Sequence, residues 1–231
     1  MTLWETIARV QTATGDDIAL RQRDELFEIR YNGIELMSNL NHHSEDQLAL
    51  LLLRQMDFSA KHILIAGLGL GYTLRAVLDL VAEDVSVTVC ELIPEVVEWN
   101  RGPLGHLAGH PLSDPRVRVV VADIRAHLQS VDAEYDLILL DTDNGPEIVI
   151  RPENGALYAD CGMQDVLQAL KPEGLAAFWS ATASTAFETG LSGFGWEWQR
   201  KDIALIPGRV DAMHHIYICR YDGARRLKLA A

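Results

Sequence analysis

From residue 61 onward, short apolar runs alternate with segments whose apolar positions recur every three to four residues. The apolar runs at 62–66, 86–90, 117–121, 136–140 and 175–179 predict five buried strands. The segments at 72–81, 94–100, 158–170 and 184–191, with a short one from about 124, predict helices. Strands that alternate with helices indicate a mostly parallel sheet that is covered on both faces.

A different pattern fills the first 40 or so residues, where the runs 18–21, 26–31 and 34–37 predict β-strands. Asn32–Gly33, between two of these runs, predicts a hairpin turn. Ser44 is the predicted N-cap of a helix over 48–56. We therefore expect an N-terminal β-hairpin element with a linking helix at 1–55, and a Rossmann-like domain at 56–231.

Two late strands are predicted at 198–205 and 214–219, with a short turn around Pro207–Gly208 between them. Such strands pair antiparallel, and we expect them at the sheet edge. A late antiparallel hairpin is typical of the methyltransferase variant of the doubly wound fold. The predicted fold class is therefore α/β, a Rossmann-like S-adenosylmethionine-dependent methyltransferase fold with a small N-terminal β-rich element.

Glycines and carboxylates follow four successive predicted strands. They are Gly67, Gly69 and Gly71 after the first strand, then Glu91, Asp123 and Asp141, with Asp143 two residues further on. Ligands of open α/β sheets bind beyond the carboxyl ends of the strands. Glycine lets the backbone approach a ligand closely, and the following helix N-terminus offers free N–H groups. The alternative for the glycines is a tight strand-to-helix turn without a ligand.

Each carboxylate has a binding interpretation and a structural one. Glu91 can accept hydrogen bonds from ribose hydroxyls, or it can cap the next helix. Asp123 can bind an adenine amino group, and it can also be the N-cap of the helix from Ile124. Asp141 lies over the expected pocket, or it forms a turn. An NAD site is less well matched, because Tyr72 stands where the dinucleotide fingerprint has its last glycine or alanine.

The net charge of −13 disfavours nucleic acid as a partner and favours cations. No apolar run approaches the roughly 20 residues that span a bilayer, and the N-terminus lacks a signal-peptide pattern, so we expect a cytoplasmic protein without membrane contact.

The three cysteines match no metal or redox motif and are expected to be buried. The adjacent pairs His42–His43 and His214–His215 are not ready chelates, so no metal is expected. A basic tail, expected to be solvated, contains Arg225, Arg226 and Lys228.

Over roughly residues 30–180 the chain resembles the spermidine synthase (polyamine aminopropyltransferase) family. The segments that carry the resemblance are ILIAGLGLGYTLRAVL, VCELIPEVVEW, DPRVRVVVADIRAHL, YDLILLDTDNGPE and LKPEGLAAFW. The acidic motif after the second strand and the D-P-R-V before the third are the more specific parts. The hairpin before the first helix is similar to the small β domain of that family.

The resemblance implies a reaction in which an aminopropyl group moves from decarboxylated S-adenosylmethionine to an amine. It implies that the glycine turn holds the thioether nucleoside, that Glu91 binds the ribose and Asp123 the adenine. Asp141 would orient and deprotonate the attacking amine, because an alkylammonium has no free lone pair. Asp143 or Asn144 would be the second acidic position of the family's D-S-S-D pattern, with Asp143 favoured. The resemblance also implies a homo-oligomer, expected to be a dimer.

The chain departs from the family pattern at the amine end. Leu70 stands where the family has the aspartate that holds the donor's ammonium, and Glu45, Asp46 and Gln47 replace a Tyr-His-Glu stretch. Three functions therefore stay open. They are an aminopropyltransferase, an S-adenosylmethionine-dependent methyltransferase, and a non-catalytic nucleoside-binding protein; the donor is S-adenosylmethionine or its decarboxylated form.

Overall fold

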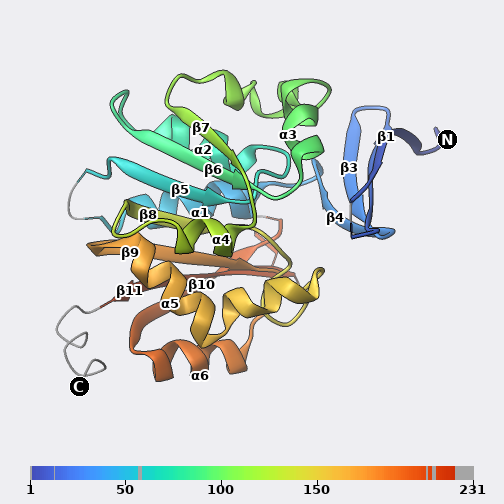
Figure 1. The fold of residues 1–231 in the computed structure, drawn as a ribbon. Helices are drawn as coiled ribbons and strands as arrows, with labels where there is room; N and C mark the ends of the chain where they lie inside the picture. The colour runs from blue at the N-terminus through green and yellow to red at the C-terminus, as the bar shows by residue number, and fades with distance from the viewer. Residues whose placement is uncertain (1, 13, 57–58, 207, 210–211, 222–231) are drawn as a thin grey trace.

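The computed structural model describes residues 2–12, 14–56, 59–206, 208–209 and 212–221. It contains a seven-stranded sheet and a separate four-stranded sheet at one end of it (Figure 1). Pro207 and the basic tail with Arg225, Arg226 and Lys228 lie outside the described residues, so the predictions made for them are not addressed. No helix in the described part of the chain has the length and apolar character needed to cross a membrane.

The large sheet has the strand order β10-β11-β9-β8-β5-β6-β7. Its five parallel strands are β5 (His62–Ala66), β6 (Ser86–Glu91), β7 (Val117–Val121), β8 (Tyr135–Leu140) and β9 (Leu170–Ser180). β10 (Trp196–Ala204) and β11 (Met213–Tyr221) pair antiparallel, and β11 joins them to β9. This arrangement confirms the predicted fold class, including the late hairpin at the sheet edge.

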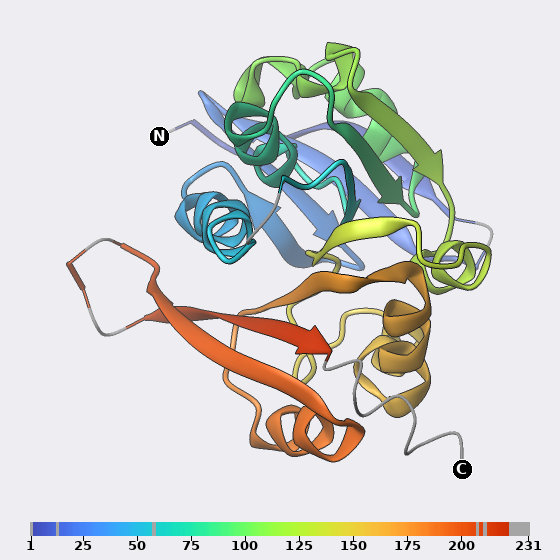
Figure 2. The same ribbon diagram turned by 90° about the vertical axis from the view of Figure 1, so that its left-hand side faces the viewer.

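Helices cover both faces of the large sheet (Figure 2). One core contains residues of α1 (His43–Leu53), α2 (Tyr72–Leu80) and α3 (Pro94–Arg101). The other contains residues of α4 (Ile124–Gln129), α5 (Asp160–Ala169) and α6 (Thr185–Phe194). Successive side chains of a strand point to opposite faces, and so Ile63 and Ile65 join the first core while Leu64 and Ala66 join the second.

The small sheet is an antiparallel meander of β1 (Glu5–Gln11), β2 (Asp17–Arg23), β3 (Leu26–Tyr31) and β4 (Ile34–Ser38). The predicted turn joins β3 to β4, with φ of 49° at Asn32 and 81° at Gly33, as hairpin turns with two left-handed residues require. Ile18, Leu20 and Ile29 extend the first core into this sheet. The small sheet is therefore fixed to the large sheet through a shared apolar interior.

Several boundaries differ from the prediction. β1 was not predicted, because its residues are mostly exposed and polar and carry no apolar run. α1 begins at His43, and Ser44 is not its N-cap: the Ser44 hydroxyl bonds to Glu45 and His214 instead. Cys161 is exposed, contrary to expectation, while Cys90 and Cys219 are buried.

The predicted helix over 158–170 divides into two elements. A 3₁₀-helix, η3, spans Pro152–Tyr158, and α5 begins only at Asp160. Residues 171–174, which follow the predicted helix, lie within β9, where the pairing with β8 loses its regular register. Two further 3₁₀-helices, η1 (Gly105–Ala108) and η2 (Pro111–Ser113), connect α3 to β7.

Candidate functional site

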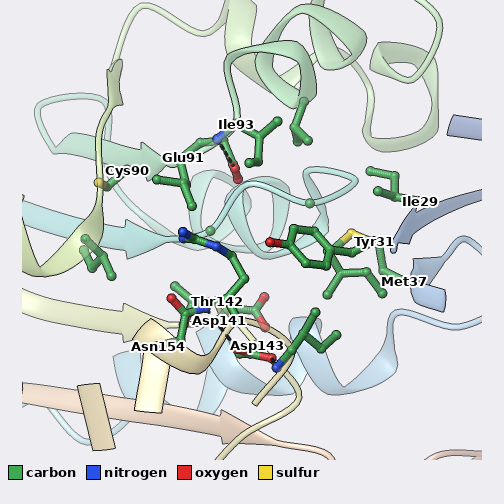
Figure 3. A pocket seen from close by; sticks show the side chains of 18 of the residues that line it. Ile29, Tyr31, Met37, Cys90, Glu91, Ile93, Asp141, Thr142, Asp143 and Asn154 are labelled. Atoms are coloured by element: carbon green, nitrogen blue, oxygen red, sulfur yellow. Dashed lines mark hydrogen bonds between the residues drawn. The ribbon is translucent and has the colours of Figure 1, made fainter. Parts of the chain in front are cut away.

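With the exception of Gly71, the predicted site residues at the four strand ends come together around one cavity. Gly67 and Gly69 follow β5, Glu91 ends β6, Asp123 follows β7 and Asp141 follows β8, and all five line it. Tyr31 and Met37 reach the same cavity from the small sheet (Figure 3). This glycine-turn cavity has a volume of about 90 Å³. Its place beyond the carboxyl ends of parallel strands is where ligands bind in such sheets.

The glycine turn is packed too tightly for side chains. Gly67 has φ of 90°, and a Cβ there would lie 2.1 Å from the backbone oxygen of Asp141. Gly69 has φ of 52°, and its Cβ would lie 2.6 Å from the sulfur of Met37. Gly71 is the N-cap of α2, without a side-chain cap. The glycines therefore allow the turn to lie between the end of β8 and the small sheet.

Glu91 is only 8% exposed and fixes the glycine turn. Its Oε2 accepts a 2.9 Å hydrogen bond from the backbone N–H of Leu68, and its Oε1 accepts a 2.8 Å bond from that of Ile93. Burial raises the pKa of Glu91, while these N–H donors lower it. Each carboxylate oxygen has a second lone pair, so both oxygens can still accept a ligand hydroxyl.

Asp123 is the N-cap of α4. Its Oδ1 accepts from the backbone N–H groups of Arg125 at 3.0 Å and Ala126 at 3.1 Å. The structural interpretation of this residue is thereby confirmed. The side chain also lines the glycine-turn cavity, which keeps the predicted adenine contact compatible with capping. That contact stays a prediction.

Asp141 is held at the end of β8 by two elements. Its backbone N–H donates to Ala66 at 2.9 Å, and its Oδ2 accepts a 2.6 Å hydrogen bond from the Thr73 hydroxyl of α2. Burial, and then the charge of Glu45, raise the pKa of Asp141 to about 7, against the lowering effect of Thr73. A carboxyl group with a pKa near neutrality is suited to accept a proton at physiological pH.

A second, larger cavity of about 410 Å³ adjoins the first. We call it the acidic cavity, because four carboxylates line it: Glu35, Glu45, Asp141 and Asp143. Leu70, Trp179 and His214 add apolar and aromatic surface. The two cavities share Leu36, Met37, Gly69, Asp141, Thr142 and Asp143. This shared border, with Asp141 on it, is the place where two bound molecules could meet.

Asp143 and Asn144 both line the acidic cavity. The carboxylate of Asp143, 5% exposed, accepts from the backbone N–H groups of Asn144 and Ile150 at 2.8 Å each, and from the Asn154 amide at 2.9 Å. These bonds fix the loop after β8. They do not address the predicted contact of Asp143 or Asn144 with a substrate, which stays a prediction.

Sequence reasoning did not identify several residues that line the two cavities. Tyr31 and Met37 come from the small sheet, and Arg151 and Asn154 come from the segment between β8 and α5. Nη1 of Arg151 is buried without a hydrogen-bond partner among the described residues. His214 lines the acidic cavity from β11. None of these residues belongs to a local motif, and only the tertiary fold brings them to the strand ends.

The fold and the joined cavities define an α/β protein of the Rossmann-like methyltransferase class, with its ligand cavities at the carboxyl ends of the parallel strands. Residues 45–188, more than half of the chain, match the family model of the spermine/spermidine synthase domain. The chain therefore belongs to the spermine/spermidine synthase family.

Curated relatives and solved structures agree with this membership. The chain is 33% identical over 79 residues to a polyamine aminopropyltransferase of Korarchaeum cryptofilum (strain OPF8), covering 34% of this chain and 24% of that protein. It is 28% identical over 115 residues to a polyamine aminopropyltransferase of Bacillus subtilis (strain 168), covering 50% of this chain and 39% of that protein. The matched stretches thus span less than half of either relative.

Two solved structures share the fold. A spermidine synthase in complex with the transition state analogue AdoDATO superimposes with a TM-score of 0.73 at 21% identity, over 96% of this chain and 75% of that one. A spermidine synthase from Thermotoga maritima gives a TM-score of 0.71 at 20% identity, over 96% and 74%. At this level of identity the likeness concerns the fold.

Proposed function

We propose that the protein transfers an aminopropyl group from decarboxylated S-adenosylmethionine to a cationic amine. The observation that carries this proposal is the position of Asp141 on the border between the two cavities. One cavity has the glycines and carboxylates suited to a nucleoside, and the other has the carboxylates suited to an alkylammonium. Membership of the spermine/spermidine synthase family supports the same activity.

The donor would occupy the glycine-turn cavity. Gly67, Gly69 and Gly71 form the turn along which the thioether nucleoside lies, and Glu91 accepts hydrogen bonds from the ribose hydroxyls. Asp123 accepts a hydrogen bond from the adenine amino group. The network around Glu91 supports this assignment, because a preorganised carboxylate binds without first being ordered.

The acceptor amine would enter the acidic cavity. Asp141 binds its ammonium group and takes a proton from it, which frees the nitrogen lone pair. The nitrogen then bonds to the donor carbon beside the sulfonium, the carbon–sulfur bond breaks, and its electrons neutralise the sulfur. Asp143 and Asn144, which line the same cavity, would contact the acceptor beyond the reacting nitrogen.

The test is an assay that pairs S-adenosylmethionine and its decarboxylated form with a panel of diamines and polyamines. We expect methylthioadenosine and an elongated amine only with the decarboxylated donor. Release of S-adenosylhomocysteine from the carboxylated donor would instead identify a methyltransferase. A thermal shift with methylthioadenosine but no turnover of either donor would identify a non-catalytic nucleoside-binding protein.

The methyltransferase alternative rests on Leu70. This residue is 3% exposed and apolar, so it offers no carboxylate for the ammonium of an aminopropyl donor. S-adenosylmethionine also carries an ammonium group, but its neighbouring carboxylate makes that end neutral overall. The acidic lining of the second cavity favours the aminopropyl reaction, because it suits a polycationic acceptor.

Three further properties belong to the same proposal. The protein is a homodimer, supported by apolar side chains exposed at the small sheet, where Ile34 is 59% and Ile7 41% exposed. Residues 1–55 and 56–231 form the two parts that enclose the substrates between them, supported by the contribution of Tyr31 and Met37 to the glycine-turn cavity. The protein acts in the cytoplasm, as the sequence predicts.

A further inference from the structure

A hydrogen-bonded chain leads from the acidic cavity to β11. The Ser44 hydroxyl donates a 2.6 Å hydrogen bond to Oε2 of Glu45 and lies 2.9 Å from Nδ1 of His214. Ser44 is 4% exposed, whereas His214 is half-buried and Glu45 and His214 both line the cavity. A hydroxyl both donates and accepts, so this serine can pass a proton between a carboxylate and an imidazole.

Glu45 and Asp141 act on each other across the acidic cavity. The charge of Glu45 is the second cause, after burial, of the raised pKa of Asp141. Burial raises the pKa of Glu45 as well, and the charge of Asp46 adds to this effect. Two carboxylates in one partly enclosed space favour a shared proton or a bound cation, because both cannot be charged there without cost.

We propose that Glu45 is a second carboxylate of the acceptor site, and that Ser44 and His214 carry the proton of the reaction from it towards solvent. This inference rests on the proposed aminopropyl transfer and specifies how its proton leaves. Glu45 would touch the acceptor ammonium together with Asp141, whereas Ser44 and His214 act through Glu45.

The acceptor nitrogen forms a bond to carbon, the carbon–sulfur bond breaks, and its electron pair goes to the sulfonium sulfur. The nitrogen loses one proton to the pair of Asp141 and Glu45. Once Glu45 is protonated, its O–H donates to the Ser44 oxygen and the serine O–H turns to an unprotonated Nδ1 of His214. Glu45 then passes its proton to Ser44 as the serine gives its own to Nδ1, and the imidazole releases a proton from Nε2. No oxidant or reductant takes part.

The surroundings suit a transient proton carrier. Burial, and then the neighbouring charge of His215, lower the pKa of His214, which disfavours a lasting positive charge on its ring. His215 bonds to Asp202 at 2.8 Å, away from Ser44.

The other titratable groups around the two carboxylates, Glu45 and Asp141, are Glu35, His42, Asp46, Tyr72, Asp143 and Tyr158. His42 bonds to Asp46 at 3.0 Å, so this second histidine on the same side belongs to a different pair.

The experiment compares S44A, S44T and H214Q in the aminopropyl transfer assay, with H215Q and, at an exposed loop position, D132N as controls. We expect S44A and H214Q to lower kcat by about 10-fold or more, within the usual worth of a positioned proton-transfer group, and to increase the solvent deuterium isotope effect. S44T keeps the hydroxyl and should restore kcat. The affinity of each variant for methylthioadenosine, measured by calorimetry, should stay unchanged. An unchanged affinity also shows that the variant is folded.

E45Q provides an independent measurement. Removal of the Glu45 charge lowers the pKa of Asp141, so the acidic limb of the profile of kcat/KM for the amine should move to lower pH. D132N, at an exposed loop position, should leave the profile in place. Wild-type kcat and isotope effect in both S44A and H214Q would overturn the proton path. An unmoved profile in E45Q would overturn the second carboxylate. Absence of transfer by the wild type would instead overturn the proposed function, and this inference with it.

Discussion

The hydroxyl of Thr73 donates a 2.6 Å hydrogen bond to the carboxylate of Asp141, and so joins the first turn of α2 to the residue that follows β8. The glycine turn lies between β5 and this helix. The element that would bind the donor and the group that would act on the acceptor are therefore linked by one contact. A shift of the glycine turn on donor binding would reach Asp141 through Thr73.

Thr73→Val should raise the pKa of Asp141 above about 7, because the hydrogen bond from Thr73 lowers it by stabilising the carboxylate. If the ionised carboxylate is the base, the acidic limb of the kcat/KM profile moves to higher pH. The rate at pH 6 then falls more than the rate at pH 9. A profile of kcat/KM measured from pH 5.5 to 9.5 tests this expectation. T189V, at an exposed position of α6, is the control. Equal loss at all pH values would contradict the expectation.

Glu91→Ala should weaken binding of methylthioadenosine by about 1–3 kcal/mol, the scale of hydrogen bonds to a charged group. The same change removes the contacts to Leu68 and Ile93, whereas Glu91→Gln keeps the side-chain shape and one acceptor oxygen, and so keeps at most one of these two contacts. Calorimetry gives the affinities. Glu98→Gln on the exposed side of α3 is the control, and unchanged affinity in both Glu91 variants would contradict the ribose assignment.

The proposed homodimer should persist at micromolar concentration, because a small sheet that exposes Ile7 and Ile34 is stabilised by further apolar contact. Light scattering or sedimentation measures the mass directly. Ile34→Lys, which places a charge on an exposed apolar position of β4, is expected to shift the mass towards the monomer if the small sheet forms the interface. A monomeric wild type would exclude the dimer.

Much of this architecture follows from short-range sequence signals. The apolar strands of the large sheet and Pro94 at the start of α3 are local patterns, and they placed Gly67, Glu91, Asp123 and Asp141 at strand ends correctly. The late hairpin also followed from two strands with little chain between them.

The rest depends on contacts between distant segments. β1 is stabilised as a strand by pairing with β2, which its mostly polar residues do not signal. Ser44 was assigned to a cap because serine favours that position, but its hydroxyl meets His214, 170 residues away, and a local rule cannot detect that partner. The contributions of Tyr31 and Arg151 to the glycine-turn cavity have the same origin.

Asp141→Asn should change the pH dependence of stability in a defined direction. The folded-state pKa of about 7 lies above the ordinary value of 3.8, so the folded protein holds a proton that the unfolded chain releases. This stabilisation is fully present below pH 4 and is lost as pH rises through 7. Asparagine is neutral throughout, so the Tm of the variant relative to wild type should rise between pH 5 and pH 8. A Tm difference that is independent of pH would contradict the raised pKa.

The same substitution tests the proposed reaction most directly. Asp141→Asn keeps the size of the side chain and can still accept the hydrogen bond from Thr73, but it cannot take a proton from an ammonium group. We expect affinity for methylthioadenosine to stay nearly intact, because Asp141 lies at the border of the glycine-turn cavity, and turnover to fall by about 10²-fold or more. Asp132→Asn, at an exposed loop position, is the matched control and should keep wild-type turnover. If Asp141→Asn also keeps it, the proton must leave by a group other than Asp141. Glu45, the other carboxylate acting on this site, would then become the first candidate for the base.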